Sequence, residues 1–155
     1  MNLYNKKIKM FDMTVYNEAV FTVLVLMGGL YANDDHGYKE IQLLDKEITK
    51  ILILPFQNEA EILVQKMSTF SKIFSDIKER FRCRDNSVLP TAMKLHRKGK
   101  PTFLTSIISR DTLCQTFKWS QTEMGLFDFL YHDCESLWNN FEEIFKLQQM
   151  HDEAN

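Results

Sequence analysis

Two long stretches of this chain place large apolar residues alternately three and four positions apart, the spacing of helices that pack lengthwise on one another. In the first stretch these positions are Ala60, Leu63, Met67, Phe70, Phe74, Ile77 and Phe81. In the second they are Met124, Phe127, Tyr131, Cys134, Trp138, Phe141 and Phe145. An apolar stripe of this length needs a long partner helix to cover it, so the two stretches predict a pair of packed helices.

The remainder of the sequence favours the same fold class. Only three Pro and five Gly occur among 155 residues, which favours long helices over a turn-rich β fold. Apolar residues at helical spacing between Ile41 and Leu52 predict a helix that ends by Leu54, because Pro55 disfavours helical geometry at the residue before it. We therefore predict an all-α protein, a single domain over residues 1–155, built as a bundle of five or six helices.

Two local patterns place the helices of the second half. Apolar residues from Phe103 to Phe117 predict one helix that opens after Pro101, since proline is favoured at first helical positions. Ser120 and Glu123 have the spacing of a capping box, in which each side chain accepts a hydrogen bond from a free backbone N–H group. The last helix is predicted to begin at this box.

The N-terminal region allows two interpretations. Residues 1–12 are polar and basic and predict a flexible arm, whereas the run from Ala19 to Tyr31 is apolar on all sides and predicts a buried central helix from about Tyr16. The same run also fits a signal peptide cleaved near Ala32. It is shorter than the roughly 20 residues that a membrane span needs, so we predict no transmembrane span.

A short polar segment, residues 32–40, follows the apolar run and is predicted to be a turn. Its carboxylate oxygens suit Ca²⁺ or Mg²⁺, its imidazole suits a softer metal, and Gly37 would let the backbone curl around an ion. The alternative is a capping turn, in which Asp side chains accept hydrogen bonds from the N–H groups of the following helix. The candidate ligands of a divalent metal ion are Asp34, Asp35, His36 and Glu40.

The order of an apolar helix, an acidic turn with Gly and a helix with an early Glu resembles the TerB-like tellurite-resistance helical domains. The residues that carry the resemblance are Glu18 to Tyr31, Asp34, Asp35, Gly37 and Glu40. The resemblance extends over residues 16–81 and 101–130, although the second turn, at Lys118 and Trp119, has no acidic residue. It implies an all-helical fold and a role as an interaction or stress-response module, with a metal ion at the acidic turn.

Charge is segregated along the chain, although the net charge is only −2. Residues 78–100 carry eight basic side chains against two acidic ones, and residues 120–155 carry eight acidic against one basic. We take residues 84–100 as a basic connecting segment. Together with the end of the preceding helix, this segment is predicted to bind either an external polyanion or the acidic last helix. The candidate phosphate or nucleic-acid ligands are Arg80, Arg82, Arg84, Lys94, Arg97, Lys98 and Lys100, with Phe81 and His96 as stacking partners.

Two smaller groups also have a pattern that can support chemistry. Asp128, His132 and Glu135 share one face of the last predicted helix, as a helix-borne metal site requires, but a solvent-facing polar stripe has the same spacing. Cys83 lies among three arginines, whose positive charge would stabilise a thiolate. The sequence assigns no general base to it, so an ordinary exposed cysteine is the alternative.

The absence of a Gly-rich phosphate loop and of the common zinc-protease and serine-hydrolase patterns favours a protein that is not an enzyme. Three cysteines, odd in number and without a C-x-x-C pair, favour a reducing compartment such as the cytoplasm. The main expectation is a helical interaction or stress-response module that binds another protein or a second copy of itself. The alternatives are a phosphate or nucleic-acid binder through residues 78–100 and a secreted helical-bundle protein.

Overall fold

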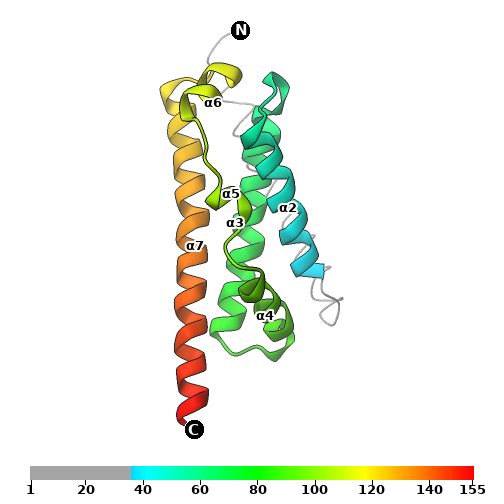
Figure 1. Cartoon of the computed structure of the whole chain (residues 1–155), viewed down its shortest axis with the longest axis vertical. Helices are drawn as coiled ribbons and strands as arrows, with labels where there is room; N and C mark the ends of the chain where they lie inside the picture. Colours follow the sequence, from blue (N-terminus) through cyan, green and yellow to red (C-terminus); the bar gives the residue numbers. More distant parts are fainter. Residues whose placement is uncertain (1–35) are drawn as a thin grey trace.

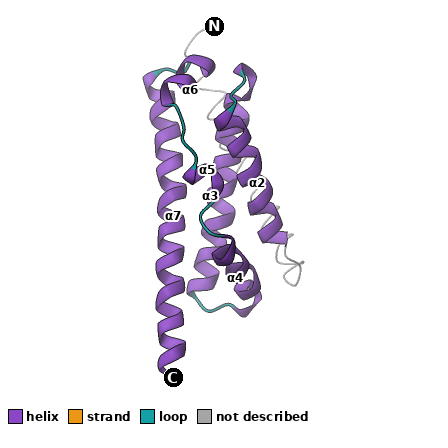
Figure 2. Ribbon diagram, in the orientation of Figure 1, coloured by secondary structure: helices purple, strands orange, loops and turns teal. Residues whose placement is uncertain are grey.

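Figures 1 and 2 show the computed structural model of the protein, which describes residues 36–155. Over these residues the chain forms helices joined by short connections and no strand, so the all-α prediction is confirmed. None of the helices in this part combines the length and the apolar composition that crossing a bilayer requires. The α-helices are α2 (His36–Ile53), α3 (Ala60–Arg82), α4 (Leu89–Lys98), α5 (Thr102–Thr105), α6 (Arg110–Phe117) and α7 (Gln121–Ala154), with the 3-10 helices η1 (Gln57–Glu59) and η2 (Asn86–Val88).

The α3–α7 seam, formed by the facing apolar stripes of α3 and α7, is the centre of the molecule. Figure 1 shows the two helices side by side along the long axis, with α2 on the other side of α3. Every predicted stripe position is buried except Ala60 and Tyr131, which are half-buried. The ring of Phe141 meets that of Phe74 edge-on, with centroids 5.4 Å apart. The predicted pairing of the two long helices is confirmed.

The helix α2 packs against α3 and begins earlier than the sequence predicts. The predicted turn over residues 32–40 is wrong from His36 onward, because His36 is the first residue of α2. A Cβ atom added at Gly37 would lie 3.4 Å from Ile77 Cδ1 of α3 and 3.8 Å from Thr91 Cγ2 of α4. The start of α2 therefore touches both helices, and Gly37 is not part of a loop that could curl around an ion. The predictions for residues 1–35, namely the basic arm, the central apolar helix and two of the metal ligands, lie outside the described residues.

The single helix predicted over residues 103–117 is wrong, because α5 and α6 are separated by an extended segment that starts at Ser106. The side chain of Ile107 in this segment is 99% exposed, so no packing holds this residue in a helix. Ser109 then caps α6, and its hydroxyl accepts a hydrogen bond from the N–H of Thr112 at 3.2 Å. The local serine cap competes with continuation of the helix.

Asp45 of α2 fixes the position of α5. Its side chain is buried, and its carboxylate accepts hydrogen bonds from the N–H groups of Thr102 and Phe103, both at 2.9 Å. The hydroxyl of Thr49 donates a further hydrogen bond at 3.3 Å. A carboxylate at the start of a helical turn pairs N–H groups that have no partner within the turn. The start of α5 is thus set by a residue 57 positions earlier in the sequence.

The segment predicted to connect the helices over residues 84–100 contains η2 and the ten-residue helix α4. Its inner face is buried through Val88, Ala92 and Leu95, which recur at helical spacing. The helix ends at Gly99, whose φ of 86° lies in the left-handed region that favours glycine. The outer face of α4 consequently becomes a defined surface and not a loop.

The start of α7 is as predicted. The hydroxyl of Ser120 accepts a hydrogen bond from the N–H of Glu123 at 3.3 Å, and the Glu123 carboxylate accepts one from the N–H of Ser120 at 2.6 Å. Both halves of the capping box are therefore present.

Candidate functional site

The predicted metal ligands are described only in part. His36 and Glu40 lie four residues apart in the first turns of α2 and so share one side of the helix. His36 is exposed and Glu40 is half-buried, while Asp34 and Asp35 precede the described residues. Within residues 36–155 no group of three or more His, Cys, Asp or Glu side chains is placed to hold a metal ion. Binding of a divalent metal ion at the start of α2 stays a prediction.

Two of the three polar residues on one face of α7, Asp128 and Glu135, join α7 to other segments. Arg110 of α6 forms an ion pair with Asp128, and Lys100 Nζ lies 3.8 Å from a carboxylate oxygen of Glu135. His132, between them, is exposed. Two of the three side chains thus pair with cations of other segments and do not face a common metal position.

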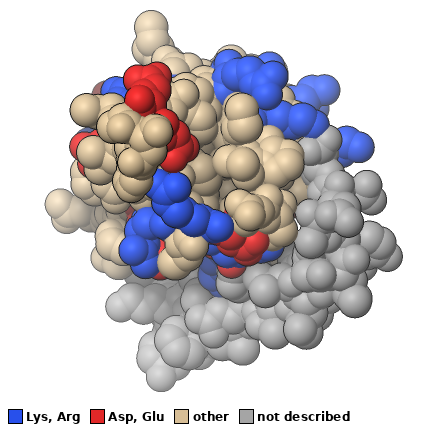
Figure 3. Space-filling view, turned by 90° about the horizontal axis from the view of Figure 1, so that it is seen from below, with Lys and Arg blue, Asp and Glu red and all other residues tan. Residues whose placement is uncertain are grey.

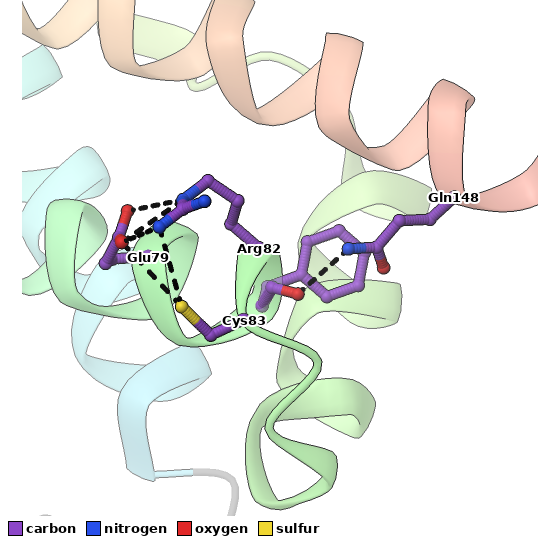
Figure 4. Close-up of polar contacts among 5 residues, drawn as sticks. Glu79, Arg82, Cys83 and Gln148 are labelled. Carbon is purple, nitrogen blue, oxygen red and sulfur yellow. Dashed lines mark hydrogen bonds and ion pairs between the residues drawn. The ribbon is translucent and has the colours of Figure 1, made fainter.

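Cys83 is exposed at the end of α3, and Figure 4 shows its surroundings. Arg82 Nη2 lies 3.6 Å from Sγ, but Arg82 Nε also donates to both carboxylate oxygens of Glu79, at 3.0 and 3.1 Å. This hydrogen bonding holds the pKa of Glu79 below its ordinary value. Because the charged Glu79 carboxylate lies 3.8 Å from the thiol, it balances the positive charge expected to activate Cys83. Cys134, in contrast, is buried as predicted, and burial raises the pKa of its thiol to about 12.

Four of the seven predicted phosphate ligands are engaged by carboxylates. Arg80 is an example. Its Nε lies 3.0 Å from Oδ2 of Asp85, and its Nη2 donates a hydrogen bond to Ser87 Oγ at 2.7 Å. Hydrogen bonds from Ser87 and from Arg80 lower the pKa of Asp85 to about 2, so this carboxylate is charged at neutral pH. The pairs are Arg80 with Asp76 and Asp85, Arg82 with Glu79, Arg84 with Asp152, and Lys100 with Glu135.

Both predicted stacking residues are also used within the molecule. Phe81 is buried, and its ring stacks on Phe145 with centroids 5.6 Å apart. The ring of His96 lies 3.8 Å from that of Phe145, almost parallel to it, and His96 Nδ1 lies 2.9 Å from Glu142 Oε1. Phe81 is therefore not available to a nucleic-acid base, and one face of the His96 ring is already covered by Phe145.

The other three predicted ligands, Lys94, Arg97 and Lys98, lie on one surface of α4, which we call the α4 outer face. Arg97 and Lys98 are exposed, and within residues 36–155 neither forms an ion pair. Lys94 is half-buried, with Nζ 5.8 Å from the ring centroid of Tyr38. Figure 3 views this end of the molecule and shows basic side chains in separate groups, some beside acidic ones. The α4 outer face consists of Leu89, Met93, Lys94, Arg97 and Lys98.

Two apolar residues of this surface were not among the predicted site residues. Leu89 and Met93 are 42% and 41% exposed, and they precede Arg97 at steps of four. Residues at these steps project from the same side of a helix. The buried residues 88, 92 and 95 mark the inner side of α4. Once this segment is taken as a helix, the sequence therefore places Leu89 and Met93 on the outward side.

In comparisons with known proteins, no protein-family model, no curated protein and no solved structure matches this chain.

Proposed function

We propose that this protein is a non-enzymatic helical binding module that docks on a negatively charged partner through the α4 outer face. The observation that carries the proposal is that Arg97 and Lys98 are exposed and, within residues 36–155, free of ion pairs. Arg80, Arg82, Arg84 and Lys100 are instead paired with carboxylates of the same molecule. Positive charge that no internal carboxylate balances is available to an external anion.

The arrangement of the two cations supports the proposal. Arg97 and Lys98 are adjacent in the last turn of a helix whose inner face is anchored in the core. A fixed group of like charges binds a polyanion at several points without first ordering a loop. Because the residues are exposed to solvent, the attraction should weaken as salt concentration rises.

The resemblance to TerB-like domains supports the same general class, a helical interaction module. A stress-response role is implied by this resemblance alone and stays a proposal. The two aspartates on which the resemblance depends precede the described residues.

A titration of a fluorescently labelled heparin oligosaccharide, a linear polyanion, with the full-length protein over a series of salt concentrations tests the proposal. We expect salt-sensitive binding by the wild type. In Arg97→Gln/Lys98→Gln the slope of log K against log salt concentration should become shallower by about 2, because two cationic contacts are lost.

The matched control is Lys46→Gln/Lys50→Gln, which removes the same charge from exposed positions of α2. This control should bind as the wild type does. If both double variants lose the same affinity, overall charge and not the α4 outer face determines binding, and the proposal is wrong. Absence of binding at low salt to heparin and to the vesicles described below also ends it.

A further inference from the structure

We propose that the negatively charged partner of the α4 outer face is the surface of an anionic lipid bilayer. This inference rests on the proposed function and names its partner class. It follows from two features: the apolar residues that share the surface with the cations, and the internal use of the predicted stacking rings.

The α4 outer face combines side chains that suit the two layers of a membrane surface. Arg97 and Lys98 can pair with lipid phosphates and carboxylates, while Leu89 and Met93, each about two-fifths exposed, can enter the boundary of the acyl chains. Helices that lie at a bilayer surface have this composition, with apolar residues flanked by Lys and Arg. Leu and Met would contribute little on the sugar-phosphate surface of a nucleic acid.

Nucleic acid is also disfavoured by the rings behind α4. Single-stranded nucleic acids are bound by a basic groove together with aromatic rings on which bases stack. Phe81 is buried, and one face of the His96 ring is stacked on Phe145, so both predicted stacking residues already pack within the molecule. Lipid headgroups need no stacking ring, and charge together with apolar contact is sufficient.

Co-sedimentation of the full-length protein with vesicles tests the inference. One set contains phosphatidylcholine alone, and the other contains phosphatidylcholine with phosphatidylserine. We expect the protein to bind the anionic vesicles far more strongly than the neutral ones. The Arg97→Gln/Lys98→Gln variant should lower the partition coefficient onto anionic vesicles about 30-fold, the loss of two cationic contacts to the surface.

Two further variants make the outcome specific. Leu89→Gln/Met93→Gln should also weaken binding to anionic vesicles but should leave heparin binding within about twofold, because only a bilayer accepts the apolar side chains. Lys46→Gln/Lys50→Gln should sediment as the wild type does. Helical circular dichroism of each variant establishes that it is folded before its binding is compared.

The results separate this inference from the proposed function. Binding to heparin without binding to anionic vesicles overturns the lipid inference and leaves the proposed function standing. Equal binding to neutral and anionic vesicles, or vesicle binding unchanged in Arg97→Gln/Lys98→Gln, also overturns it. Binding of an acidic polyglutamate peptide through the same two cations, with no vesicle binding, would instead assign a protein partner.

Discussion

The α3–α7 seam and the α4 outer face both place large side chains at helical spacing, yet only the seam is covered by the molecule itself. Phe74 and Phe141 of the seam have no exposed surface, whereas Leu89 and Met93 remain about two-fifths exposed. The same spacing therefore gives a core where a partner helix is present and an open surface where none is. Changes in the seam should alter folding stability, and changes on the α4 outer face should alter binding.

The largest effect on stability is expected from Phe141→Ala. This ring contacts the rings of Phe74 and Trp138 and is fully buried, so its removal should destabilise the fold by about 3–5 kcal/mol. Met93→Ala, the matched change on the α4 outer face, should cost less than about 1 kcal/mol. Urea denaturation monitored by circular dichroism measures both. Similar losses for the two variants would mean that Met93 is part of the core and would remove the contrast.

A smaller loss of folding stability is expected from substitution of Asp45, whose buried side chain accepts hydrogen bonds from the start of α5. Asp45→Ala leaves the N–H groups of Thr102 and Phe103 without their acceptor and should cost about 1–3 kcal/mol. Asp45→Asn retains one oxygen acceptor and should cost less than the alanine variant. The same denaturation experiment compares them, and a smaller loss for alanine than for asparagine would contradict the capping role.

The sequence predicts those features whose partners are either local or repeated. The capping box of α7 needs only Ser120 and Glu123, and the seam is marked by a stripe on each of its two helices. The break after α5 was missed because the apolar positions from Phe103 to Phe117 concealed the serine cap of α6 at Ser109. The helix α4 was missed because its basic residues obscured the buried residues of its inner face.

The sequence was sufficient to predict which basic residues belong to the candidate site. It was not sufficient to predict which of them the fold pairs with carboxylates. Arg97 and Lys98 were among the predicted ligands, together with four basic residues that the fold pairs with carboxylates. The partner of Arg84, Asp152, lies 68 residues further along the chain, and only tertiary packing brings it near. A list of basic residues therefore states how much charge is present, and the fold decides how much of it is balanced.

The smallest effect is expected at the turn that joins α3 to α4, and it depends on pH. Asp85 has its pKa lowered from an ordinary value of 3.8 to about 2, chiefly by hydrogen bonds from Ser87. Between these values the unfolded chain binds the proton more readily, so the stabilising contribution is complete above about pH 4 and is lost as the pH falls towards 2. Wild type should therefore lose more thermal stability than Asp85→Asn over this range. Parallel losses in melting temperature would show that the hydrogen bonds of Asp85 do not contribute.

Asp45 also determines which parts of the molecule can open independently. The single turn α5 would be expected to fray if it stood alone, since short helices are marginal in water. To release the N–H groups of Thr102 and Phe103, however, the molecule must leave a buried carboxylate without partners or expose it by opening α2 as well. The amide hydrogens of these two residues should thus exchange with solvent as slowly as those of α2, and much more slowly than those in the exposed last turn of α7. In exchange kinetics, we therefore expect the shortest α-helix of the described chain to open together with α2.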